Sequence, residues 1–450
     1  MSSPAIAASP ATESRAAAET LLKPLQFTGK MYRRMSILLL AVIGWGMFCF
    51  LYQAFVGLGV TGLRRPVFWG FFVTDFVFWI GISHAGTLIS AILRLTNATW
   101  RFAVTRAAEA ITVFALMIGG LFPIVHLGRP WLFFWLAPYP NERLIWPNFR
   151  SPLEWDFFAI STYITASTIY LFLPLIPDLA LARDRARGWR QKLYRSLSMN
   201  WQGTQTQWHK LELAIQLMAA VVIGVAVSVH TIVSWDFAMA VVPSWHSTIF
   251  GPYFVAGAIF SGIAALIIIM AILRRVYHLE AYLTPKHFSN LGKLLLTMTL
   301  LWGYFVTNEL ITTWYGNLPD EMSTFWSKIS GHYAPLFWTM VICNFLIPFP
   351  ILALKRLRTI TGTVIASITI IIGMWLERFL IVVPGAANQR LSFNSWFGYY
   401  PHWTEISITL ATLSAMALLY MGFSKLFPLI SIWELGGGKH AAAPETGGTQ

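Results

Sequence analysis

Residues 250–273 read FGPYFVAGAIFSGIAALIIIMAIL, an apolar run without a single charged side chain. Because about 20 helical residues cross the hydrocarbon core of a bilayer, a run of this length predicts a membrane-spanning helix. Runs of the same kind recur along the chain, and together they number ten: 36–57, 68–93, 104–126, 157–181, 211–234, 250–273, 291–315, 334–354, 360–382 and 403–424. We therefore expect an all-α integral membrane protein with about ten transmembrane helices.

Composition and charge agree with this class and suggest an orientation. The 450 residues are 56% hydrophobic and 11% charged, whereas soluble domains carry about 25% charged residues. If the N-terminus is cytoplasmic, 24 of the 32 Lys and Arg residues fall on the inner side. The positive-inside rule then places both chain ends in the cytoplasm. The net charge of +13 is thus a membrane-topology signal and gives no reason to expect a nucleic-acid partner.

Two pairs of similar helix ends suggest an internal repeat. Ala91-Ile-Leu-Arg-Leu95 resembles Ala271-Ile-Leu-Arg-Arg275, and Leu173-Pro-Leu-Ile-Pro177 resembles Ile347-Pro-Phe-Pro350. A shift of four helices keeps both copies in the same direction, which predicts two parallel four-helix bundles, helices 2–5 and 6–9. The expected organisation is a disordered cytoplasmic tail 1–30, peripheral helix 31–60, first bundle 66–240, second bundle 248–385, peripheral helix 400–426 and a disordered tail 436–450.

Three ionisable residues are expected at the outer level of the first bundle. His126 ends the third span, Asp156 begins the fourth and Asp236 ends the fifth. Since successive spans alternate in direction, these three positions share one membrane level. An imidazole and two carboxylates can orient the hydroxyls of a quinol and accept its protons. The structural alternative is that each carboxylate caps a helix or pairs with Arg129 or Arg150, at little cost near the interface.

Four further polar residues are candidates for a proton path. Asp75 and His84 lie on the second span, Glu109 on the third and Glu309 on the seventh. Ionisable groups at membrane depth are costly and mark functional sites by default. They serve equally well as hydrogen-bond partners between helices, which is a common role for polar groups in bundles. His230 is expected to be a packing residue.

The sequence offers few ligands for a metal centre. Cys49 and Cys343 are isolated within apolar runs, so the chain is expected to hold no iron–sulfur cluster and no disulfide. A di-haem site needs facing histidines at matched depth, and no such pair is evident among His84, His126 and His230. We expect no haem and no metal ion in this chain.

The segment His126-Leu-Gly-Arg-Pro-Trp131, with Trp155-Asp156, Ser83-His-Ala-Gly-Thr87 and Trp235-Asp236, resembles the NrfD/PsrC-like family of quinone-binding membrane subunits. Ten helices with a repeat of four look most like ActC, the large NrfD-like component of bacterial alternative complex III. The resemblance implies a menaquinol-oxidising site at the periplasmic face, built by His126, Asp156 and Asp236, with Arg129 as a further binding residue. The position that matches Asp156 in the second bundle falls near Ser330, without a nearby carboxylate, so one such site per chain is expected.

The resemblance also implies partners and a location. The partners are iron–sulfur and multihaem cytochrome c subunits on the periplasmic side and a second NrfD-like membrane subunit, in the bacterial inner membrane. We therefore expect the quinol-binding subunit of a respiratory electron-transfer complex, with proton translocation as a family hypothesis. The alternatives are the quinone subunit of a molybdenum-dependent reductase such as polysulfide reductase, an ion or proton transporter, and a purely structural anchor.

Overall fold

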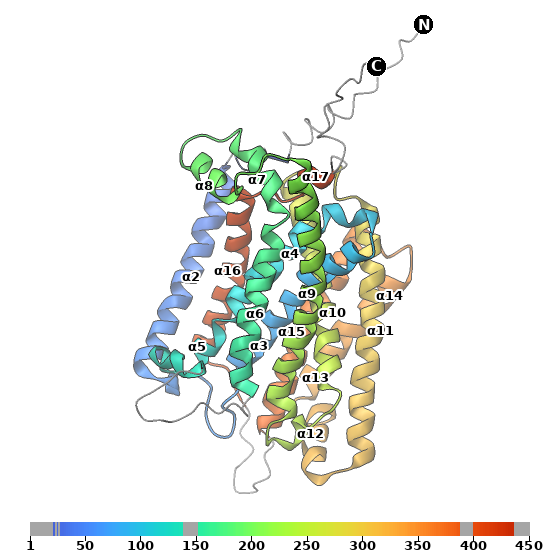
Figure 1. Cartoon of the computed structure of the whole chain (residues 1–450). Coiled ribbons are helices and arrows are strands. Elements are labelled where there is room, and N and C mark those ends of the chain that lie inside the picture. The colour runs from blue at the N-terminus through green and yellow to red at the C-terminus, as the bar shows by residue number, and fades with distance from the viewer. Residues whose placement is uncertain (1–20, 23–24, 26–27, 138–151, 388–398, 436–450) are drawn as a thin grey trace, which may run out of the picture.

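The computed structural model describes residues 21–22, 25, 28–137, 152–387 and 399–435, and helices dominate all of the longer segments. The predicted tails, 1–30 and 436–450, lie almost wholly outside the described residues. The long helices run roughly parallel to one axis (Figure 1). The helices that matter below are α2 (Lys30–Val56), α3 (Phe71–Leu95), α4 (Thr105–Gly119), α5 (Phe122–His126), α6 (Pro152–Phe172), α7 (Leu175–Arg183), α8 (Trp189–Leu197), α9 (Gln205–Ala238), α10 (Phe250–Val276), α11 (Pro285–Gly316), α12 (Pro319–Ile329), α13 (Ala334–Val341), the π-helix η5 (Ile342–Leu346), α14 (Pro348–Ala353), α15 (Ile360–Ala387), α16 (Trp403–Leu426) and α17 (Ile432–Leu435).

The number of membrane-crossing elements matches the sequence prediction. Within the described ranges, nine helices are long and apolar enough to cross a membrane, and the count reaches ten if the bent pair α6–α7 is one span. In this count α4 and α5 form one span, as do α13, η5 and α14. The prediction of an all-α integral membrane protein with about ten spans is confirmed.

Helix α3 is the central element, since it packs against α4, α9, α10 and α15, and with α4, α6 and α9 it forms a first group of helices. Its contact with α4 is close because of one glycine: a Cβ at Gly86 would lie 1.7 Å from the Ala108 carbonyl oxygen. At the same place the Thr112 hydroxyl donates to the Ser83 carbonyl oxygen over 2.6 Å and accepts from the Thr87 backbone N–H over 2.9 Å. Small residues and interhelical hydrogen bonds replace the hydrophobic effect as the source of helix association in lipid.

The fourth span bends by 51° between α6 and α7. Pro174 and Pro177 cannot donate backbone hydrogen bonds, which accounts for the break. At the break, the Pro174 carbonyl oxygen accepts from the Arg106 guanidinium over 2.8 Å and from the Trp433 indole N–H over 2.9 Å. The break is therefore stabilised by side chains from two other parts of the chain.

The remaining helices form a second group and an outlying pair. Helix α10 packs against α11 and α15, while α13 and α14 pack against α15. Helices α2 and α16 pack mainly against each other and lie together at one side of the molecule (Figure 1). The residue limits given above for the two bundles stay a prediction.

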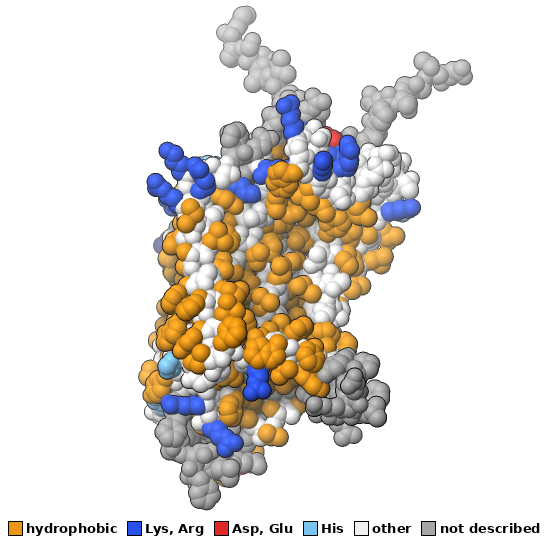
Figure 2. All heavy atoms as spheres, turned by 90° about the vertical axis from the view of Figure 1, so that its left-hand side faces the viewer, with side chains coloured by type: hydrophobic (Ala, Val, Ile, Leu, Met, Phe, Trp, Pro, Cys, Tyr) orange, Lys and Arg blue, Asp and Glu red, His pale blue; other side chains and the backbone are white. Residues whose placement is uncertain are grey.

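The surface carries the chemistry that a bilayer requires. On the face that includes α2, hydrophobic side chains cover the middle, and Lys and Arg side chains lie toward both ends (Figure 2). Large apolar side chains of α2 such as Phe48, Leu38 and Phe55 are more than half exposed. Exposure of this extent is favourable against lipid or another apolar surface and unfavourable against water.

Candidate functional site

The carboxyl groups of Asp156 and Asp236 lie within hydrogen-bonding reach of each other. Asp156 is the fifth residue of α6, which begins at Pro152, and Asp236 is in the last turn of α9; these two helices pack side by side. Both residues are buried, with 5% and 6% of their surface exposed. Two carboxyl groups can hydrogen bond to each other only when one of them carries a proton. A carboxyl pair in this position can hold one proton between two helices.

The structure places His126 at the end of α5 and does not bring it into contact with this pair. Among the described residues, no hydrogen bond joins His126 to either carboxyl group. The Nδ1 atom of His126 is buried and has no hydrogen-bond partner in the described part of the chain. Helix α5 is instead tied to α2, because the Gln53 side chain donates to the Val125 carbonyl oxygen over 2.9 Å. Arg129 follows in the turn after α5.

The turn after His126 explains part of the motif that carried the family resemblance. Gly128 has a φ of +69°, a conformation that L side chains rarely adopt, and a Cβ there would lie 2.7 Å from Leu58 Cγ. Pro130 then opens a short 3₁₀ helix, Pro130–Leu136, where its fixed φ suits the first position. The glycine and proline therefore fix the position of His126 relative to the end of α2.

Four buried polar atoms at this end of the first group have no hydrogen-bond partner among the described residues: His126 Nδ1, Glu154 Oε2, Asp156 Oδ1 and Asp236 Oδ1. Buried polar atoms usually have hydrogen-bond partners, so these four are free to bind a ligand or water. Beside it, the indole rings of Trp155 and Trp235 meet edge to face with their centroids 5.9 Å apart. Glu154 was not singled out from the sequence, although it lies only two residues before Asp156.

A histidine pair lies deeper in the same group of helices. His84 on α3 and His230 on α9 are both fully buried, and their ring centroids are 4.3 Å apart. The His84 ring nitrogens contact the carbonyl oxygens of Ile80 and Ala226 at 2.9 and 2.6 Å. A carbonyl oxygen only accepts, so the ring makes both bonds only when both nitrogens carry hydrogen. Both ring nitrogens of His230 lack a hydrogen-bond partner among the described residues. We expected His230 to be a packing residue, and that role does not explain two buried nitrogens without partners.

Hydroxyl groups continue from His84 along the interior face of α3. The Tyr163 ring lies 5.0 Å from the His84 ring, and its hydroxyl is 2.8 Å from the Thr87 hydroxyl. One helical turn further, the Ser90 hydroxyl donates to Glu109 and lies 3.3 Å from the Tyr170 hydroxyl. The spacing of the polar residues on α3, three to four positions apart within an apolar span, is the signal that could have identified this face from the sequence.

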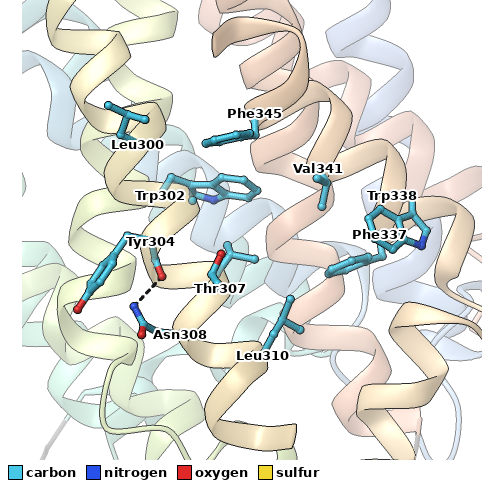
Figure 3. A pocket seen from close by; sticks show the side chains of 12 residues that line it. Leu300, Trp302, Tyr304, Thr307, Asn308, Leu310, Phe337, Trp338, Val341 and Phe345 are labelled. Carbon is cyan, nitrogen blue, oxygen red and sulfur yellow. Dashed lines mark hydrogen bonds between the residues drawn. The ribbon is translucent and has the colours of Figure 1, made fainter.

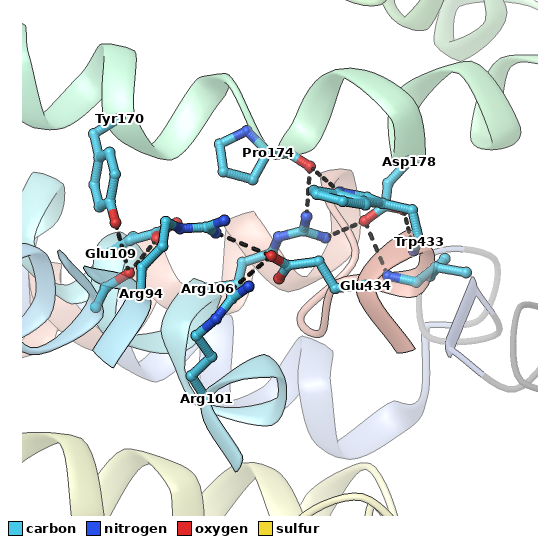
Figure 4. A network of polar contacts seen from close by, with 11 residues as sticks. Arg94, Arg101, Arg106, Glu109, Tyr170, Pro174, Asp178, Trp433 and Glu434 are labelled. Atoms are coloured by element: carbon cyan, nitrogen blue, oxygen red, sulfur yellow. Dashed lines mark hydrogen bonds and ion pairs between the residues drawn. The ribbon is translucent and has the colours of Figure 1, made fainter. Parts of the chain in front are cut away.

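The polar face of α3 ends in a cluster of ion pairs (Figure 4). Glu434 on α17 pairs with Arg94 at 3.0 Å and with Arg101 at 2.8 Å. Arg106 pairs with Asp178, whose carboxylate also accepts from the backbone N–H groups of Ile432 and Trp433. The cluster docks the short helix α17 against α3, α4 and α7.

The other two residues of the expected proton path lie elsewhere. Asp75 accepts from the Trp375 indole and the Thr409 hydroxyl, so it joins α3 to α15 and α16. Glu309 lies on α11 and accepts from the Ser247 hydroxyl over 3.3 Å. The structure therefore brings His84 and Glu109 into one polar series and leaves Asp75 and Glu309 outside it.

The two rings of the His84–His230 pair are too close together to hold a metal ion between them. Two imidazoles on opposite sides of one metal ion need two metal–nitrogen bonds of about 2 Å each between them. Ring centroids at 4.3 Å leave no room for that arrangement. Within the described residues, no group of three or more His, Cys, Asp and Glu side chains is arranged to hold a metal ion.

Comparison with known proteins identifies the family. A family model described as "Polysulphide reductase, NrfD" matches residues 59–388, which is well over half of the chain. A Halobacterium salinarum protein, provisionally named as a membrane subunit of dimethyl sulfoxide reductase, is 26% identical over 87% of this chain and 89% of its own length. A selenate reductase subunit of Mesobacillus selenatarsenatis is 22% identical over 83% and 89%. The Hdr-like menaquinol oxidoreductase integral membrane subunit of Archaeoglobus fulgidus is 24% identical over 91% and 96%. The chain therefore belongs to the NrfD/polysulphide reductase family of membrane subunits.

Proposed function

We propose that this chain binds and oxidises menaquinol for a membrane-bound oxidoreductase complex, at the Asp156–Asp236 pair, with His126 at the end of α5 as a second proton acceptor. The observation that carries the proposal is the pair of buried carboxyl groups, Asp156 and Asp236, which lie within hydrogen-bonding reach of each other and each keep an oxygen without a partner among the described residues. A relative named as a menaquinol oxidoreductase subunit supports the substrate class.

The chemistry of the site follows from the balance of the reaction. A quinol loses two electrons and two protons on oxidation. The ionised member of the carboxyl pair accepts a hydrogen bond from one quinol hydroxyl and then its proton, and His126 is the base available for the second hydroxyl. We assign the electron acceptors to iron–sulfur or haem centres in partner subunits, as the sequence resemblance implies.

Several finer features belong to this proposal. We place the site at the periplasmic face and both chain ends in the cytoplasm, because 24 of 32 basic residues fall on that side. Membership of alternative complex III, with multihaem cytochrome c and a second NrfD-like protein as partners, follows the sequence resemblance. The His84–His230 pair and the hydroxyl series to Glu109 are the proposed route for protons through the first bundle.

A second assignment has its own support. Two of the relatives are named as subunits of dimethyl sulfoxide reductase and selenate reductase. In a complex of that kind the chain would anchor a terminal reductase, and the same site would supply its electrons. Identification of the proteins that purify with this chain distinguishes the two complexes.

Substitution of the carboxyl pair tests the site. Asp156→Asn and Asp236→Asn keep the size of each side chain and replace an ionisable carboxyl group with an amide, which does not act as a base. We expect quinol oxidation by the purified complex to fall by about 10²–10⁴-fold, the usual contribution of a general base. Glu321→Gln on α12, a carboxylate in the second half of the chain, serves as the matched control. Near-normal turnover of both Asp variants in an assembled complex would refute the assignment, and His126→Ala reports separately on the imidazole.

A further inference from the structure

Helix α17 covers one end of the polar interior of the first group of helices, the series of hydroxyl groups that leads from His84 to Glu109. The helix lies against α7 at one end of the molecule (Figure 1). Its Glu434 reaches Arg94 and Arg101 (Figure 4), and the side chains of Glu434 and Arg94 are only 2% and 9% exposed. The short helix therefore separates a charged cluster from its surroundings.

The polar series on α3 lies directly behind this cluster. Arg94 follows Ser90 by one helical turn, and its charge acts on both Glu109 and Glu434. The Ser90 hydroxyl donates to Glu109. Ser90 and Tyr170 are fully buried, and Glu109 is 1% exposed. The way from Glu109 to this end of the molecule thus leads past Arg94 to α17.

The groove between α11 and α13 provides a contrast (Figure 3). Among the described residues that line it none is charged, and its Tyr304 and Trp338 are 61% and 50% exposed. An apolar lining of this kind is stable against lipid and gives water no polar groups to bind. The groups under α17 are charged, and water stabilises them as soon as it reaches them. Of these two places, the α17 end is the one where water can enter the protein.

The way α17 is held allows it to leave. Four residues are too few for a helix that is stable by itself, so α17 depends on its contacts. Most of these are polar: Asp178 accepts from the backbone N–H groups of Ile432 and Trp433, and the Trp433 indole donates to the Pro174 carbonyl oxygen. Glu434 Oε2 is buried without a hydrogen-bond partner among the described residues. Because water can replace these polar contacts, undocking costs less than the loss of an apolar helix contact.

We propose that α17 is a lid over this end of the polar interior. Docked, it keeps water away from Ser90 and Glu109; released, it admits water to them. The lid belongs to a segment that follows residues 59–388, the part of the chain that the family model matches. Its bearing on proton transfer rests on the proposed function, because a proton route through Glu109 reaches water at this end only while the lid is released.

The accessibility of a cysteine behind the lid tests the proposal in the intact, detergent-solubilised complex. Ser90→Cys places a thiol beside Glu109, and methanethiosulfonate ethylsulfonate, a charged reagent, modifies that thiol only where water reaches it. We expect slow modification with α17 docked and at least about tenfold faster modification when Asp178→Asn is added, because loss of one partner of a buried ion pair shifts the docking equilibrium by more than this factor. Mass spectrometry of peptides separates this label from label on Cys49 and Cys343.

Two further variants provide the controls. Ser261→Cys, on α10, is buried against Gly81 of α3 with 2% of its surface exposed, and it should react slowly with and without Asp178→Asn. A stop codon in place of the Ser431 codon removes α17 and leaves every membrane span intact. This truncation should accelerate the modification of Ser90→Cys at least as much as Asp178→Asn does.

Each outcome either supports or overturns the lid. Fast modification of Ser90→Cys with α17 in place, or an unchanged rate after the truncation, would show that α17 does not keep water out. Equal acceleration of Ser261→Cys would show a general loosening of the protein and would also overturn the proposal. The labelling needs no quinol, so a failure of the proposed function, seen as normal turnover of Asp156→Asn, is measured separately.

Discussion

Removal of the Asp178 charge is expected to release helix α17 from the rest of the protein. In Asp178→Asn, Arg106 keeps its charge at a site where 2% of its side chain is exposed. Loss of one partner of a buried ion pair costs about 3–5 kcal/mol. The carbonyl oxygens of Pro174, Ile430 and Pro428 remain 2.8, 3.3 and 3.4 Å from the guanidinium, so the cost is expected at the lower end, about 3 kcal/mol.

Hydrogen exchange measures this cost locally. Undocking of α17 admits water to Arg106, so the lost free energy favours the undocked state. At 1.36 kcal/mol for each factor of ten, about 3 kcal/mol corresponds to a roughly 150-fold faster exchange of the Ile432 and Trp433 amides, which donate to Asp178. The assay is exchange followed by mass spectrometry of the peptide that contains residues 428–435.

An exposed ion pair provides the matched control. Arg183 and Asp184 are 2.8 Å apart, with side-chain exposures of 24% and 64%, and pairs of this kind contribute about 0–1 kcal/mol. Asp184→Asn should therefore change the exchange of the same peptide by no more than a few fold. Equal exchange rates in Asp178→Asn and Asp184→Asn would refute the argument that the buried Arg106–Asp178 ion pair holds α17 in place.

Three further substitutions test the helix contacts and the polar interior. Gly86→Leu adds a side chain at a position where even a Cβ would lie 1.7 Å from the Ala108 carbonyl oxygen. The variant protein should therefore be lost from membranes, as measured by immunoblot. Gly44→Leu, at a position with open space around it, should accumulate normally. Gly128→Val is strained by its positive φ and by contact with Leu58, and it should lower quinol oxidation by displacing His126; normal turnover would contradict this role of the turn. Tyr163→Phe removes the hydroxyl that bonds to Thr87 and should slow proton-coupled turnover and change its solvent isotope effect; an unchanged isotope effect would exclude the hydroxyl from the proton route.

The spans were predictable because apolar length is a local property of the sequence. The bend in the fourth span was also encoded locally, in Pro174 and Pro177, although the apolar run across it read as one continuous helix. The docking of α17 was not predictable, because it depends on Asp178 and Arg94, which are far apart in sequence and contact α17 only after the spans pack.

The candidate site shows the limit of reasoning by membrane level. The end of one span and the start of another can be assigned to the same level from chain direction alone, and Asp156 and Asp236 lie together in the structure. Level does not fix the rotation of a helix about its axis, which advances by about 100° per residue. For the same reason no pattern in the sequence indicated that His84 and His230 face each other, or that the end of α5 is tied to α2.

The most direct test of the proposed function is a structure of the intact complex with a non-oxidisable quinol analogue bound. We predict that a ring hydroxyl lies within about 3 Å of a carboxyl oxygen of Asp156 or Asp236, with the second hydroxyl directed toward His126. An analogue bound at another place, with the Asp156–Asp236 pair still joined and its surroundings unchanged, would contradict the assignment of this pair as the quinol site.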